Sequence, residues 1–142
     1  MTRKVNVTLT VALKDNGEKS QTTMQSGGLL TEKDGALALW YTEPDAESDV
    51  VTEVRVAIER DKVIISRAGF VSSCMTLTEG QEERWEYQTP YGAMELPVVC
   101  SKLCNEVTPA GGRLYAEYCV NTAGDTQGIQ AVLEYLVEEV QE

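Results

Sequence analysis

Arg67 is a charged residue at a position where the sequence pattern favours a core-facing side chain. It follows Val63 and Ile65 at alternate positions, and alternate residues of a strand share one face. A guanidinium on an apolar face needs a partner, because burying an unpaired charge is costly; Glu95 is a candidate. Arg67 could anchor the carboxylate or phosphate of a ligand, or it could form an ion pair that fixes strand register or closes a barrel end.

Four aromatic residues could line a pocket beside this arginine. Trp85 and Tyr87 share one face of a predicted strand, and Tyr41 and Tyr118 lie on the apolar faces of two others. Rings with polar tips are typical of ligand pockets. Aromatic residues at alternating positions are more often plain core, so both interpretations remain open.

The sequence offers little that could catalyse a reaction. It contains no histidine, which removes the commonest general base, the commonest metal ligand and the usual activator of a Ser or Cys nucleophile. It also lacks the Gly-x-Ser-x-Gly and Gly-x-Gly-x-x-Gly motifs and a phosphate-binding Gly-Lys-Ser/Thr loop. No spacing among the glutamates singles out an acid–base pair. We therefore expect a protein that is not an enzyme, with no catalytic residues.

The four cysteines, Cys74, Cys100, Cys104 and Cys119, do not form a recognisable metal or redox motif. Cys100 and Cys104 are spaced by four, not three, and paired zinc knuckles are missing. No apolar segment follows the charged N-terminus, and no run approaches the roughly 18 apolar residues of a membrane span. We expect reduced thiols, a cytoplasmic location, no metal and no cofactor.

The net charge of the 142-residue chain is −11, from 12 Lys and Arg against 23 Asp and Glu. Nucleic-acid binding needs clustered Lys and Arg, so the charge argues against it. The acidic stretches 43–53 and 134–142 are either a solvated surface or a face for a basic partner. Homodimerisation is plausible on base rates alone.

Alternating apolar residues joined by short turns predict an all-β chain. The expected strands cover residues 5–13, 18–31, 36–42, 50–59, 62–68, 71–78, 84–89, 93–103, 113–120 and 127–140. The turns include Asn16-Gly17 and Asp34-Gly35, and residues 43–49 read as a loop. Gly27-Gly28 suggest a bulge or bend, and Pro97 an edge or bulge. The apolar residues of 127–140 also fit the spacing of an amphipathic helix, so a helix remains the alternative for this segment.

This pattern predicts one domain over residues 1–142, a closed or nearly closed antiparallel β-barrel of about eight to ten strands. Such barrels are filled by side chains or hold one small ligand. Medium to large interior residues make a packed core as plausible here as a cavity.

The middle of the chain resembles a known family. The segments that carry the likeness are Ile65-Ser66-Arg67-Ala68-Gly69, Met75-Thr76-Leu77, Glu79-Gly80, Tyr87-Gln88-Thr89-Pro90-Tyr91-Gly92, Met94-Glu95-Leu96, Gly111-Gly112-Arg113-Leu114 and Tyr118. In this order they resemble the YwiB-like bacterial family of unknown function. The resemblance implies a calycin-type, lipocalin-like β-barrel with a closing strand near the C-terminus, but no activity. The lipocalin Gly-x-Trp signature is missing, since Ala38 stands two residues before Trp40.

Two functional hypotheses follow. The first is a non-catalytic binding module for a small, largely apolar ligand, with an acidic group near Arg67 and the rings of Tyr41, Trp85, Tyr87 and Tyr118 around it. The second is a structural or interaction protein with a filled barrel, whose acidic surface meets a basic partner.

Overall fold

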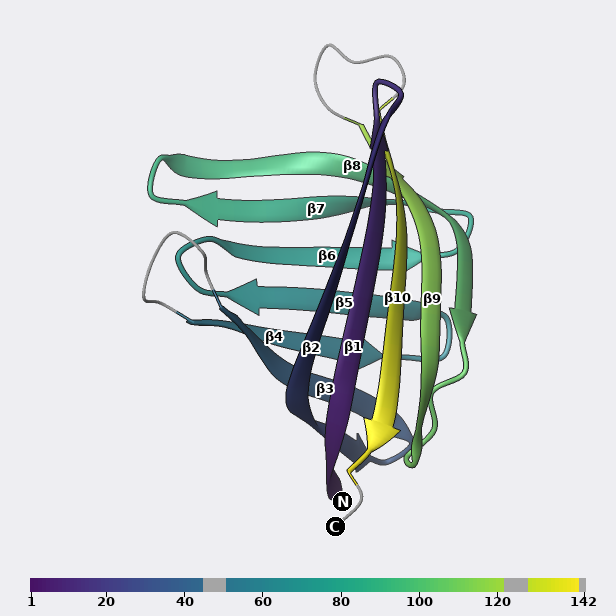
Figure 1. The fold of residues 1–142 in the computed structure, drawn as a ribbon. Coiled ribbons are helices and arrows are strands. Elements are labelled where there is room, and N and C mark those ends of the chain that lie inside the picture. The colour runs from purple at the N-terminus through teal and green to yellow at the C-terminus, as the bar shows by residue number, and fades with distance from the viewer. Residues whose placement is uncertain (45–50, 122–127, 141–142) are drawn as a thin grey trace.

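The computed structural model describes residues 1–44, 51–121 and 128–140, and these residues form ten strands and no helix (Figure 1). The strands are β1 (Thr2–Asp15), β2 (Glu18–Lys33), β3 (Ala36–Pro44), β4 (Val51–Ile58), β5 (Lys62–Ala68), β6 (Ser72–Thr78), β7 (Glu82–Thr89), β8 (Gly92–Asn105), β9 (Gly111–Val120) and β10 (Ile129–Glu139). The described residues therefore contain no helix that is long and apolar enough to span a membrane.

The strands close into one antiparallel barrel in chain order, which confirms the predicted fold class. Closure depends on β10, which pairs with β1 on one edge and with β9 on the other. Both edges of β10 thus have backbone partners, so its residues keep the strict alternation of a strand. The helical alternative for this segment is wrong.

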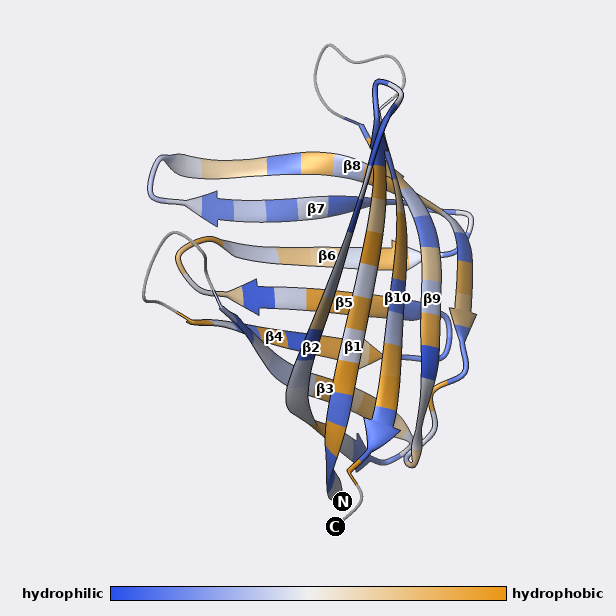
Figure 2. Ribbon diagram, in the orientation of Figure 1, coloured by the Kyte–Doolittle hydropathy of each residue, from blue (hydrophilic) through white to orange (hydrophobic). Residues whose placement is uncertain are grey.

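The barrel has two walls that cross each other. Figure 1 shows β1, β9 and β10 running across β4–β8, with β2 and β8 passing from one wall to the other. Hydrophobic and hydrophilic residues alternate along β1, β9 and β10 in Figure 2, as expected where one face is buried. The buried core residues are all apolar or aromatic among those that the structure describes.

The strand β2 begins to pair with β3 at Gly28. A Cβ on Gly28 would lie 2.5 Å from the carbonyl oxygen of Trp40, so only glycine allows β3 to approach this closely. The pairing of β1 with β2 keeps one register throughout, so the predicted bulge at Gly27-Gly28 is not found in this ladder. Figure 1 shows that β2 bends along its length as it passes from β1 to β3. The register shift lies instead between Cys100 and Lys102 in β8.

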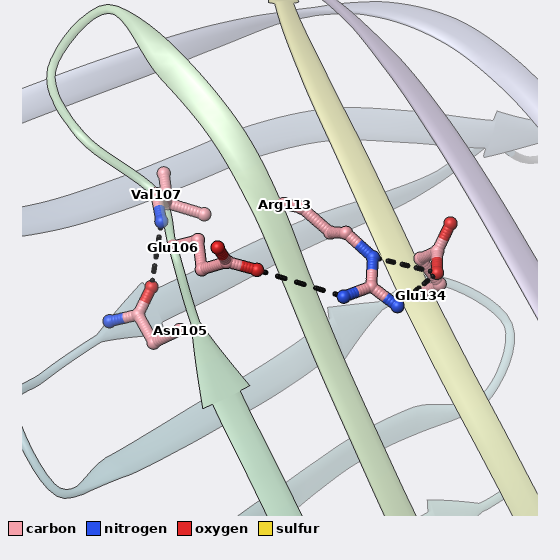
Figure 3. Close-up of polar contacts among 5 residues, drawn as sticks. All are labelled: Asn105, Glu106, Val107, Arg113 and Glu134. Atoms are coloured by element: carbon pink, nitrogen blue, oxygen red, sulfur yellow. Dashed lines mark hydrogen bonds and ion pairs between the residues drawn. The ribbon is translucent and has the colours of Figure 1, made fainter.

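The Gly-Gly-Arg motif at residues 111–113 lies at the start of β9, in the wall that β9 forms with β10. A Cβ on Gly112 would collide with the carbonyl oxygen of Glu106, and its φ of 144° also favours glycine. Arg113 then reaches outward between two carboxylates (Figure 3). Its Nη2 lies 2.8 Å from Glu134 and its Nη1 lies 3.7 Å from Glu106. This exposed ion-pair cluster links β9 to β10 and gives the motif a structural role.

Candidate functional site

A pocket of about 470 Å³ lies between the two walls of the barrel. It is in the size range of small-molecule sites and is lined mainly by apolar side chains. One wall, from β1, β9 and β10, contributes Val11, Leu13, Tyr118, Val120, Ile129, Ala131 and Leu133; the other wall and its turns contribute Thr52, Arg67, Val71, Ser73, Met75, Trp85, Tyr87 and Leu96.

The pocket lies where the two walls are no longer joined at their corners. The β2–β3 pairs cover only Gly28–Lys33 of β2, and the β8–β9 pairs begin at Val98. Leu96 comes before the first residue of the β8–β9 ladder. Arg67 lies level with the end of the β2–β3 ladder, because Tyr41 ends that ladder and Val54 pairs with both Tyr41 and Arg67. Beyond these ladders the walls can separate and leave a hollow.

Strand register places a row of polar groups on one wall of the pocket. Arg67 pairs with Ser73 across β5 and β6, and Ser73 pairs with Tyr87 across β6 and β7. Side chains of paired residues lie on the same face of a sheet. The guanidinium, a hydroxyl and a phenol therefore line up on the barrel interior, as expected for Arg67 from its alternation with Val63 and Ile65.

Four of the five predicted site residues meet at this pocket, namely Arg67, Trp85, Tyr87 and Tyr118. The rings of Trp85 and Tyr87 lie 4.7 Å apart between centroids. Trp85 Nε1 is buried and has no hydrogen-bond partner among the described residues. That leaves one unpaired donor beside an apolar pocket, and such groups are uncommon in folded proteins.

Tyr41, the fifth predicted residue, does not line the pocket. It is fully buried, and its hydroxyl lies 2.7 Å from that of Tyr135 on the opposite wall. The two rings meet edge to face at 5.8 Å. This tyrosine pair belongs to the packed core. Tyr135 is not among the predicted site residues, although the alternation of β10 places it on the buried face.

Arg67 is paired with Glu43, not with Glu95. Its Nε donates to Glu43 Oε1 at 3.1 Å, and no other described residue accepts a hydrogen bond from the guanidinium. Glu95 is exposed and pairs across β7 and β8 with Glu86, on the outer face opposite to that of Trp85 and Tyr87. The predicted partner was therefore wrong, because strand alternation turns Glu95 away from the interior.

Glu43 was missed because residues 43–49 were expected to form a loop. Glu43 and Pro44 instead extend β3, where Glu43 pairs with Thr52 of β4. Residues 45–49 lie outside the described residues. The signal that could have found Glu43 is its period-two spacing from Leu39 and Tyr41, which are both buried.

Arg67 influences all four interior tyrosines. Burial raises the pKa of Tyr87 and of Tyr135 to about 12, and it raises the pKa of Tyr41 and Tyr118 as well. In each case the positive charge of Arg67 acts in the opposite direction, because it favours the ionised phenol.

The pKa of Arg67 itself lies above its usual value. Burial lowers it, but Tyr135, Glu43 and Tyr41 more than offset that effect. The guanidinium therefore stays charged at the edge of an apolar hollow, where a carboxylate or phosphate could approach it.

A second hollow of about 530 Å³ is lined by residues of β1, β2, β8, β9 and β10, among them Lys14, Ser101 and Glu117. Of the predicted site residues only Tyr118 borders it. Lys14 and Lys19 in its lining are exposed, so the pocket beside the half-buried Arg67 remains the candidate site.

The cysteines show no metal site in the part of the chain that the structure describes. No disulfide joins any two of them, and among the described residues no group of three or more His, Cys, Asp or Glu could hold a metal ion. Burial raises the pKa of the Cys100 thiol, which disfavours the reactive thiolate. Nothing in the described part of the chain indicates catalysis.

Comparisons with known proteins agree with this fold. The crystal structure of the ywiB protein from Bacillus subtilis is similar, with a TM-score of 0.87 and 16% sequence identity, and the match covers 99% of this chain and 94% of that one. That likeness shows the fold. No curated protein matches the sequence. A family model described as a domain of unknown function, DUF1934, matches residues 7–132. The chain therefore belongs to the DUF1934 family, a YwiB-like family whose function is unknown.

Proposed function

We propose that the barrel is a non-catalytic binding module for a small, largely apolar molecule that carries one acidic group. The observation that carries this proposal is the pocket of about 470 Å³ with a charged arginine on an otherwise mainly apolar wall. The apolar part of the ligand would occupy the hollow between Trp85, Leu96 and Leu133. Its acidic group would reach the row of Arg67, Ser73 and Tyr87.

Glu43 fits this proposal because it leaves part of the guanidinium available. Glu43 holds Arg67 through Nε, and an arginine presents five N–H donors in a planar fork. A ligand carboxylate could therefore bind the terminal nitrogens while the ion pair persists. Glu43 would keep the arginine charged and oriented when no ligand is present.

Thermal shift with two matched probes tests the proposal. Decanoate and decanol share an apolar chain but differ in charge, so we expect decanoate to raise the melting temperature more strongly. Arg67→Met combined with Glu43→Gln removes both charges of the pair and should abolish the preference for decanoate. Arg113→Met, at the exposed ion-pair cluster, is the matched control and should leave it unchanged.

Two results would count against the proposal. If neither probe raises the melting temperature of the wild-type protein, the hollow does not accept an apolar ligand of this kind. If the double variant keeps the full preference for decanoate, Arg67 is not the anchor.

The competing hypothesis, a basic partner for the acidic surface, has one observation in its favour. Glu86 and Glu95 lie directly opposite each other on the exposed face of β7 and β8, and like charges in that position repel. Against it, Glu134 and Glu139 are already paired with Arg113 and Arg3. Residues 45–50 and 141–142 of its acidic stretches lie outside the described residues. Pull-down at low salt and at about 0.5 M salt separates the hypotheses, because exposed charge contacts weaken with ionic strength.

A further inference from the structure

The strand β2 has a long edge without a strand beside it. Its residues 28–33 pair with β3, whereas residues 18–27 pair only with β1 among the described strands. Residues 18–23 are all exposed, and exposure alternates from there to residue 27. An unpaired strand edge is a template for another strand, and proteins usually blunt it with charges, proline or bulges.

Apart from Glu18 and Lys19 at the end nearest the turn, none of these protections occurs along the edge. Residues 20–27 contain no charged residue and no proline, although the chain as a whole is 25% charged. The pairing of β1 with β2 also shows no register shift in this segment. Residues 20–27 of the edge are therefore uncharged, form a ladder without a bulge and can offer main-chain hydrogen bonds to another strand.

The turn at Asn16-Gly17 fixes which backbone groups face outward. In a two-residue hairpin the flanking residues, Asp15 and Glu18, form a hydrogen-bonded pair. Even-numbered residues of β2 therefore bond to β1, and Glu32 follows this rule by donating to the carbonyl of Met1. Odd-numbered residues present their N–H and C=O groups on the open side, and these are Lys19, Gln21, Thr23, Gln25 and Gly27.

The sequence of this edge is nearly its own mirror image. Residues 20–26 read Ser-Gln-Thr-Thr-Met-Gln-Ser, with Thr23 at the centre. In an antiparallel pair of two such edges about Thr23, Gln21 would face Gln25, and Ser20 would face Ser26. The charged Lys19 would face Gly27, so no like charges would oppose each other. A two-fold interface requires this kind of self-complementarity.

We propose that this edge of β2 pairs with the same edge of a second copy of the chain, antiparallel and centred on Thr23. The two barrels would share one continuous sheet through β1 and β2. The pairing is independent of the ligand proposal, because no residue of β2 lines the pocket beside Arg67.

Sedimentation velocity of the full chain from about 1 to 100 μM tests the interface. We expect a dimer that dissociates on dilution. Thr23→Pro removes the central outward N–H from both copies but no bond to β1, so it should weaken the dimer by at least about tenfold. Thr23→Val keeps the N–H and should leave dimerisation unchanged. Circular dichroism checks that both variants fold.

A charge exchange tests the register. Gln21→Lys with Gln25→Lys would oppose like charges and favour the monomer, whereas Gln21→Lys with Gln25→Glu would oppose unlike charges and retain the dimer. A wild-type protein that stays monomeric over the whole range would overturn the proposal. So would a dimer that both charge variants affect equally, since the contact would then lie elsewhere.

Discussion

The interior of this barrel has a packed half and a hollow half, built from the same alternation of residues. In the packed half Tyr41, Tyr135, Leu39 and Ile65 are almost completely buried. In the hollow half Trp85, Tyr87 and Leu96 keep part of their surface exposed. The halves differ in how far the corner ladders reach, because the walls are joined by β2–β3 pairs only from Gly28 onward and by β8–β9 pairs only from Val98 onward. A cavity can therefore arise without any change in side-chain pattern.

The largest expected contrast comes from removing one leucine from each half. Leu39→Ala should lower the free energy of unfolding by about 2–5 kcal/mol, because it leaves a cavity among buried residues. Leu96→Ala should cost less than about 1.5 kcal/mol, because its side chain already borders open space. Urea unfolding measures both. Equal losses would mean that the two halves do not differ in packing.

The two arginine ion pairs give the next contrast. Glu43→Gln leaves the guanidinium of Arg67 without its charged partner in a half-buried site, so we expect a loss of about 2 kcal/mol in unfolding free energy. Glu134→Gln removes a carboxylate from the exposed cluster around Arg113 and should cost much less, because exposed ion pairs add little to stability. Chemical denaturation of both variants at neutral pH checks the order, and a reversed order would refute the contrast.

Alkaline pH should weaken the packed half in a way that depends on Tyr135. Burial raises its pKa from 10.0 to about 12, so the folded state holds a proton that the unfolded state releases. Its contribution to stability is complete below about pH 10 and is lost as the pH rises through about 12.

Unfolding by urea at a series of pH values, with wild type and Tyr135→Phe, measures this effect. We expect a shallower alkaline decline in the variant. Tyr91→Phe is the control, because Tyr91 is 98% exposed and should not change the profile. A decline of equal slope in all three proteins would show that Tyr135 is not responsible.

The sequence predicted the fold well, because period-two alternation and the Asn-Gly and Asp-Gly turns act locally. Asn16 and Asp34 indeed adopt positive φ, followed by Gly17 and Gly35. The sequence also placed Arg67, Trp85, Tyr87 and Tyr118 on interior faces. That they bind a ligand remains a prediction.

The partner of Arg67 and the extent of the pocket could not be predicted in the same way. The place of Glu43 depends on how far β3 continues into an acidic, proline-containing segment, and strand propensity alone misjudges this extent. The pocket depends on where the ladders of β2 and β8 end, and this is a property of pairing between distant strands. Glu95 was misassigned because proximity in a motif does not fix the face of a strand.

The most direct test of the hollow half is the fluorescence of Trp85 during titration with decanoate. The chain has two tryptophans, and Trp40 lies elsewhere on the surface, so Trp40→Phe leaves Trp85 as the single reporter. Binding in the pocket predicts a saturable change in Trp85 emission with one site per chain, and a weaker response to decanol. An emission spectrum that stays unchanged through the titration would contradict the account.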